Sequence, residues 1–81
     1  MSERKSILLS HLNECYKLSQ KAVSDLALAR VWLNIISSNT GLGSVELAEV
    51  KLKEAENLIS EATDYIVVAI EHLLGAEDGK S

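Results

Sequence analysis

The chain has 81 residues, of which 47% are hydrophobic, and its 12 acidic and 8 basic residues give a net charge of −4. This length accommodates a single domain. The negative charge argues against a nucleic-acid partner, because phosphate recognition requires a clustered positive surface. No apolar run approaches the roughly 18 residues of a membrane span, and Cys15 is the only cysteine, which argues against a disulfide framework. We therefore expect one cytoplasmic domain over residues 1–81.

The first predicted helix covers residues 3–37. Its apolar residues recur in alternating steps of three and four, which is the heptad pattern of packed helices. This stripe consists of Leu8, Leu12, Cys15, Ser19, Ala22, Leu26, Ala29, Leu33 and Ile36. No proline or glycine interrupts it, so nothing predicts an earlier break. We interpret Cys15 as a small buried residue of the stripe rather than as a reactive thiol.

A loop is predicted over residues 38–44, where serine, threonine, asparagine and glycine cluster. Within it, Asn39 or Gly41 can end a helix in the left-handed conformation. Ser44 is the predicted N-cap of the helix that follows.

The second predicted helix covers residues 45–74 and ends at Gly75, and residues 75–81 form a predicted disordered tail. Along this helix an alanine recurs at every seventh position, and a larger apolar residue follows each alanine four places later. The alanines are Ala48, Ala55, Ala62 and Ala69, and the larger residues are Leu52, Ile59, Ile66 and Leu73. This is again a continuous heptad stripe along one helix face.

The two stripes match each other as an antiparallel hairpin, because nearly every facing pair then combines a large residue with a small one. Leu26, for example, faces Ala55 in this register. The same register predicts an ion pair between Arg30 and Glu49. The predicted fold class is therefore all-α, an antiparallel helical hairpin with an alternating small/large seam.

A lone hairpin of this size seldom has enough core to be stable. The simplest solution is a homodimer in which two hairpins form a four-helix bundle with two-fold symmetry. The predicted residues of this second interface are Leu18, Leu28, Trp32, Ile35, Leu58 and Tyr65, with Trp32 as the largest anchor. The flank on the other side of the seam is also apolar, which leaves open a tetramer or a groove that binds a helix of another protein. The residues of this flank are Leu9, Tyr16, Val23, Ala27, Val67, Ile70 and Leu74.

This layered hairpin resembles the Rop family of plasmid copy-number regulators, which are dimeric bundles that bind paired RNA loops. The resemblance rests on the heptad layering and the hairpin plan, and it implies nucleic-acid binding as an alternative function. Such an interface would use the exterior of the first helix. There, Glu14 and Asp25 lie among the basic and amide candidate residues and reduce the positive charge of this surface. These candidates are Asn13, Lys17, Gln20, Lys21 and Asn34.

The two histidines form the sharpest candidate metal site. We expect His11 and His72 to approach each other at the open end of the hairpin, near Glu14 and Glu71. Two imidazoles and a carboxylate suit zinc or another transition metal. The alternative, which we favour, is a pair of partly exposed histidines that hold no metal, and we expect no cofactor.

The sequence lacks the usual signatures of catalysis. No phosphate-binding glycine loop, nucleophile elbow or cluster of arginines is present. Glu56 and Asp25 flank the seam, and we expect them to form ion pairs or to extend their charged ends into solvent rather than to act as catalytic acids or bases. The predicted protein is non-enzymatic and acts through protein–protein interaction as an adaptor, small regulator or assembly subunit.

Overall fold

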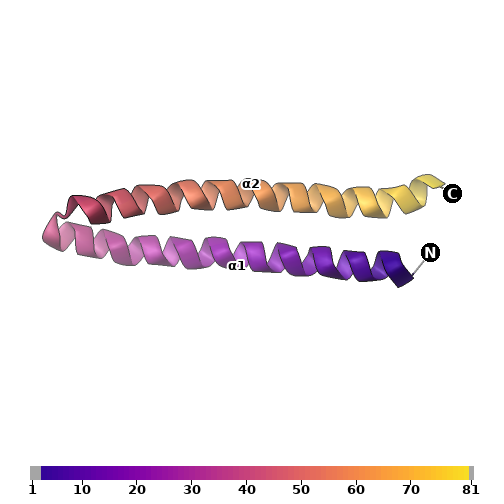
Figure 1. The fold of residues 1–81 in the computed structure, drawn as a ribbon, viewed down its shortest axis with the longest axis horizontal. Helices are drawn as coiled ribbons and strands as arrows, with labels where there is room; N and C mark the ends of the chain where they lie inside the picture. The colour runs from indigo at the N-terminus through magenta and orange to yellow at the C-terminus, as the bar shows by residue number, and fades with distance from the viewer. Residues whose placement is uncertain (1–2, 81) are drawn as a thin grey trace.

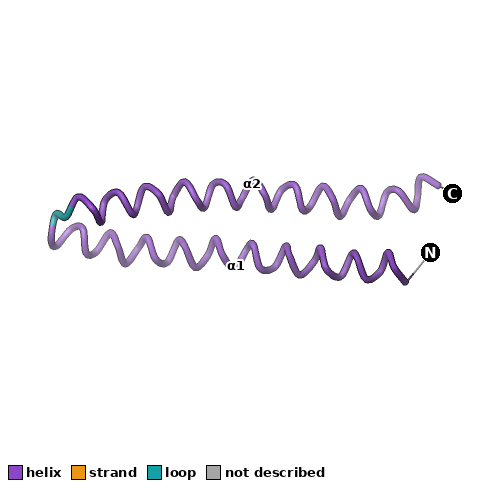
Figure 2. The backbone as a smooth tube through the Cα atoms, viewed as in Figure 1, coloured by secondary structure: helices purple, strands orange, loops and turns teal. Residues whose placement is uncertain are grey.

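The computed structural model describes the backbone of residues 3–80 and the side chains of residues 3–75. Two helices, α1 (Glu3–Thr40) and α2 (Gly43–Lys80), run antiparallel and pack against each other as one hairpin. Its Cα atoms extend over 62 × 17 × 12 Å. The connection lies at one end of the hairpin, and the start of α1 and the end of α2 lie at the other (Figures 1 and 2). The all-α class and the two-helix hairpin are thereby confirmed.

The end of α1 lies at Thr40 rather than at the predicted residue 37. The side chains of Asn39 and Thr40 each donate a hydrogen bond of 2.8 Å to the carbonyl four residues earlier, so these polar residues continue the helix. Gly41 then takes the left-handed conformation, with φ of 66°. Its N–H donates a 2.7 Å hydrogen bond to the carbonyl of Ser37, which closes the last turn.

α2 is longer than predicted at both ends. The carbonyl of Leu42 accepts backbone hydrogen bonds of 3.1 and 3.3 Å from the first turn, so the helix begins at Gly43 and Ser44 is not its N-cap. At the other end the backbone does not leave the helix at Gly75 but remains helical as far as Lys80. A glycine inside a helix costs about 1 kcal/mol relative to alanine, which does not by itself stop the helix. Of the predicted tail, residue 81 lies outside the described residues.

The seam between the helices follows the two heptad stripes over most of its length. No apolar side chain among residues 3–75 is buried, however, and the seam residues are half-buried. On α1 these are Leu12, Ser19, Ala22, Leu26, Ala29 and Leu33; on α2 they are Val45, Ala48, Leu52, Ala55, Ile59, Ile66, Ala69 and Leu73. Each helix therefore covers one side of its neighbour without enclosing a core.

The helices are rotated about their axes relative to the predicted seam. The interpretation of Cys15 as buried is wrong, because its side chain is exposed. The next residue in the chain, Tyr16, takes its place in the seam and is half-buried. Its larger side chain covers more of the opposing helix than the thiol would. The exposed predicted seam residues are Leu8, Cys15, Ile36 and Ala62, and the half-buried residues that join the seam are Leu9, Tyr16, Val23 and Arg30.

Candidate self-association surface

All the residues of the predicted second interface are exposed on the hairpin. Trp32 is 60% exposed, Leu58 is 65% exposed and Tyr65 is 74% exposed. The remaining three residues, Leu18, Leu28 and Ile35, are exposed as well. The structure thus leaves every residue of this set available to a second molecule.

The exposed residues of the heptad stripe are continuous with this set. Cys15 lies three residues before Leu18, and Ile36 lies four residues after Trp32, so each pair shares one face of α1. On α2, Ala62 lies within one turn of both Leu58 and Tyr65. We define the open side as Cys15, Leu18, Trp32 and Ile36 of α1 together with Leu58, Ala62 and Tyr65 of α2. Leu28 and Ile35 flank Trp32 one turn before and after it.

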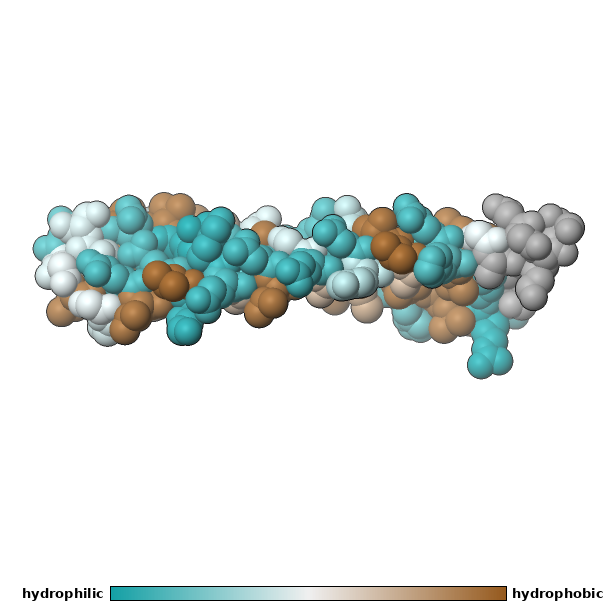
Figure 3. All heavy atoms as spheres, turned by 90° about the horizontal axis from the view of Figure 1, so that it is seen from above, coloured by the Kyte–Doolittle hydropathy of each residue, from teal (hydrophilic) through white to brown (hydrophobic). Residues whose placement is uncertain are grey.

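Apolar residues are not confined to the open side. Figure 3 shows hydrophobic and hydrophilic side chains interspersed along the whole length of the face in view. Four exposed apolar residues near the loop, Val31, Leu42, Leu47 and Val50, fall outside the predicted surfaces. Val31 belongs to a segment of α1 that is apolar around almost its whole circumference, so the sequence composition itself indicates an exposed apolar residue there. Val50 lies three residues after Leu47 on one face of α2, but polar residues follow on that face, so no continuous apolar pattern marks it.

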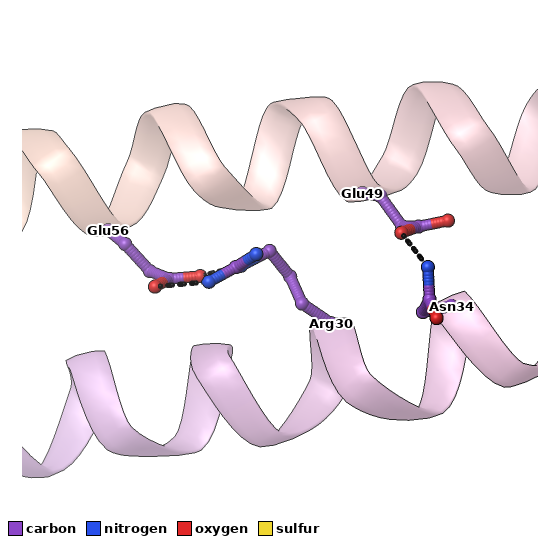
Figure 4. A network of polar contacts seen from close by, with 4 residues as sticks. All are labelled: Arg30, Asn34, Glu49 and Glu56. Carbon is purple, nitrogen blue, oxygen red and sulfur yellow. Dashed lines mark hydrogen bonds and ion pairs between the residues drawn. The ribbon is translucent and has the colours of Figure 1, made fainter.

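Polar contacts join the helices on the opposite side of the hairpin (Figure 4). The guanidinium of Arg30 donates two hydrogen bonds to the carboxylate of Glu56, from Nε to Oε2 and from Nη2 to Oε1, the latter at 3.1 Å. Asn34 Nδ2 donates to Glu49 Oε2 at 3.3 Å. These four residues define the closed side.

The predicted ion pair between Arg30 and Glu49 is therefore wrong, because Arg30 pairs with Glu56 instead. Arg30 lies between the levels of Glu49 and Glu56 along the hairpin, and its side chain extends toward Glu56 (Figure 4). Glu56 is only 7% exposed. Its expected role in an ion pair is confirmed, as is that of Asp25, which pairs with Lys21 at 2.8 Å.

Arg30 controls the titration of Glu56. The hydrogen bonds from the guanidinium are the main reason that the pKa of Glu56 lies below its ordinary value, and burial opposes this shift. The positive charges of Arg30 and Lys53 lower the pKa further. The carboxylate form of Glu56 is thus the one that the folded hairpin favours.

The apolar flank next to the closed side is largely covered by the hairpin itself. Tyr16, Val23 and Val67 are half-buried there and border a shallow groove of about 570 Å³. Its full lining is Tyr16, Gln20, Val23, Ser24, Ser60, Thr63, Asp64 and Val67. Gln20 Nε2 donates to the hydroxyl of Tyr16 at 2.9 Å, and Thr63 Oγ1 donates to the carbonyl of Ile59 at 2.8 Å. Both helices contribute polar and apolar side chains to this groove, which is open to solvent.

The other candidate residues lie on exposed parts of the hairpin. His11 and His72 are both exposed, and among the described residues no three His, Cys, Asp or Glu side chains gather as a metal site would require. Lys17 pairs with Glu14 at 3.7 Å. The amides of Gln20 and Asn34 bond to Tyr16 and Glu49, and Lys21 bonds to Asp25. Most of the candidate nucleic-acid contacts are thus engaged within the hairpin.

The two helices differ strongly in charge. α1 contains five Lys or Arg residues and three Asp or Glu residues, whereas α2 contains three Lys and nine Asp or Glu. The helices therefore carry net charges of +2 and −6, which together account for the −4 of the chain. The exposed acidic residues of α2 are Glu46, Glu54, Glu61, Asp64 and Glu71.

Comparisons with protein-family models, with curated proteins and with solved structures find no match to this chain. Within the described residues, neither helix has an apolar segment of the length that a bilayer crossing demands. The structure is thus a two-helix hairpin with polar contacts between the helices on one side and the exposed side chains of Trp32, Leu58 and Tyr65 on the other.

Proposed function

We propose that this chain is a non-enzymatic protein that forms a homodimer through its open side, so that two hairpins make a four-helix bundle. The observation that carries this proposal is that no apolar side chain among residues 3–75 is buried in the single hairpin. Hydrophobic burial is the main favourable contribution to folding, and a hairpin without a core lacks most of it. A second hairpin over the open side supplies the missing packing surface.

The positions of the uncovered residues support a bundle rather than a longer single coiled coil. In a four-helix bundle each helix packs against two neighbours, along two adjacent strips of its surface. On α1 the half-buried strip includes Leu12 and Tyr16, and the uncovered strip includes Cys15 and Leu18. These two strips adjoin each other, so a second pair of helices encloses the residues between them.

The outer surface of such a bundle suits protein–protein interaction. The exposed acidic residues of α2 remain outside the dimer interface or at its edge, and they make its outer face negative. Complementary charge guides association, so the proposed partner presents a basic surface. We propose a role as an adaptor, small regulator or assembly subunit on this basis.

The fluorescence of Trp32 tests the dimer. This residue is the only tryptophan of the chain, so its emission reports directly on the open side. We expect emission typical of a buried indole at micromolar concentration, and a red shift when dilution dissociates the dimer. Emission typical of a water-exposed indole at every concentration, from a chain whose circular dichroism is fully helical, would contradict the proposal.

The acidic outer face is tested separately with a fluorescent lysine- and arginine-rich helical peptide as probe. Fluorescence anisotropy should show binding that weakens as salt is added, because salt screens exposed charges. A peptide of the same length with glutamate in place of the basic residues is the matched control. Equal binding of the two peptides would remove charge as the basis of partner choice.

A further inference from the structure

We propose that the two hairpins of the dimer pack with their loops at the same end, so that α1 of each copy lies against α2 of the other. This inference rests on the homodimer proposed above and specifies how its two copies are oriented. A two-fold axis allows two such arrangements. An axis parallel to the helices brings both loops to one end, whereas a perpendicular axis places them at opposite ends and packs like helices together.

The charges of the helices separate these arrangements. With loops at opposite ends, α2 packs against α2, and two helices that each carry a net charge of −6 become neighbours. With loops at the same end, each α2 packs against an α1 of net charge +2. Like charges repel and opposite charges attract over distances below the Debye length of about 8 Å. Electrostatics therefore favours the arrangement with the loops together.

The small residues of α2 make this difference larger. Ala62 lies on the open side between Leu58 and Tyr65, and the other alanines of the stripe follow at intervals of seven residues. Small side chains at a helix interface allow the backbones to approach closely, as they do in other helix pairs. Contact between two α2 helices at the exposed Ala62 would therefore bring the carboxylates of the adjacent Glu61 residues to a short distance.

Individual residues of the two helices also match in the favoured arrangement. A two-fold axis parallel to the helices keeps each residue at its own distance from the loop end. Lys21 and Glu61 lie almost equally far from the loop, so Lys21 of one copy faces Glu61 of the other. Trp32 and Lys51 share a level as well, and the exposed ammonium of Lys51 suits the indole face. In the opposite arrangement α1 of one copy and α2 of the other lie diagonally across the bundle, so neither pair of residues is adjacent.

Distances between nitroxide spin labels on the two copies test the orientation. Labels are attached to Ser38→Cys, near the loop, or to Ser24→Cys, near the middle of α1, in a Cys15→Ser background. Both serines are exposed, so the labels do not disturb the seam. The label at residue 24 reports dimer formation in either arrangement and serves as the control. Helix spacings of 8–10 Å place these labels about 30 Å apart in both arrangements.

The label at residue 38 distinguishes the two orientations. With the loops together, its separation is also about 30 Å, because the labelled positions lie at the same end of the bundle. With the loops apart, a rise of 1.5 Å per residue displaces the labels by about 50 Å along the bundle, and the lateral spacing brings their total separation to about 60 Å. A long distance at residue 38 with a short one at residue 24 overturns the inferred orientation but leaves the dimer. No dipolar coupling at either site overturns both the orientation and the dimer.

Discussion

The closed and open sides of the hairpin show two ways of using the flank of a helical seam. On the closed side, Arg30 and Asn34 of α1 donate hydrogen bonds to Glu56 and Glu49 of α2, so the polar groups find their partners within one chain. On the open side the exposed residues are mostly apolar, and Trp32 is 60% exposed. A flank with internal polar partners is complete in the monomer, whereas an uncovered apolar flank indicates a second molecule.

The contrast also assigns different roles to the two sides. The polar contacts of the closed side have directional geometry, so they fix which helix faces are neighbours within the hairpin. The open side presents apolar surface, and burial of that surface is non-directional and contributes mainly to the affinity between the two copies. Changes on the closed side should therefore affect folding, and changes on the open side should affect assembly.

The largest expected effect comes from removing the main anchor of the open side. Trp32→Ala should weaken dimerisation by about 3–5 kcal/mol per site, the usual cost of truncating a large buried aromatic residue. Sedimentation equilibrium of the variant measures this change. Val31→Ala is the control, because Val31 immediately precedes Trp32 and is similarly exposed but lies outside the open side. Equal dissociation of the two variants would remove the distinction between the sides.

A change on the closed side should affect folding and its dependence on pH. Because the pKa of Glu56 is lowered in the folded state, its carboxylate stabilises the hairpin above its unfolded pKa of about 4.3. This contribution is lost as the pH falls through the lower, folded-state pKa. Glu56→Gln should therefore lower the thermal midpoint at pH 7 and flatten its decline toward acid, as followed by circular dichroism.

Glu54→Gln is the control for this experiment. Glu54 has a more exposed side chain, at 58%, and pairs with Lys51 within α2. Its replacement should leave the thermal midpoint and the pH profile close to those of the parent chain. A pH profile of Glu56→Gln that matches the parent would contradict the assigned role of the closed side.

A substitution in the loop should destabilise the hairpin as a whole, because the loop joins the helices and belongs to neither the closed side nor the open side. Gly41 has φ of 66°, which costs an L-residue roughly 1–2 kcal/mol. Gly41→Ala should lower the free energy of unfolding by this amount in a urea titration. Gly43→Ala is the control, since Gly43 is helical, its φ is not positive and no atom lies within 4 Å of the added Cβ. Equal destabilisation by both would argue against strain at Gly41.

The smallest expected effect concerns the edge of the open side. Lys21→Glu should weaken the dimer roughly two- to tenfold at low salt, and adding Glu61→Lys should restore it, as expected for exposed ion pairs between copies. Lys17→Glu makes the same charge change one turn away from Lys21, where no pairing between copies is proposed, and is the control. Sedimentation velocity over a range of concentrations measures all three. Failure of the double variant to recover would break the proposed pairing of Lys21 with Glu61.

Sequence periodicity was sufficient to predict the hairpin, because heptad spacing and the turn residues act locally. The left-handed glycine at Gly41 and the exposure of Trp32 follow from the same local rules. Rotation of the helices about their axes was not predictable in this way. Both flanks of the stripe are apolar, so the pattern does not decide whether Cys15 or Tyr16 enters the seam; the contact between helices decides it.

The partner of Arg30 escaped prediction for a related reason. A long side chain reaches either of two carboxylates that lie one turn away on the opposing helix, and Glu49 and Glu56 both meet that condition. Only the three-dimensional arrangement shows that Asn34 donates a hydrogen bond to Glu49 and that Arg30 bonds to Glu56. Residue spacing thus identified the charged groups of the closed side but not their pairing.

Sedimentation equilibrium of the unmodified chain, from submicromolar to high micromolar concentration, tests the central claim most directly. We expect a mass that rises with concentration to twice that of the chain, because two copies bury their open sides against each other. A mass equal to that of one chain throughout this range, from a protein that remains helical, would rule out the homodimer. The open side would then belong to an interface with a different protein.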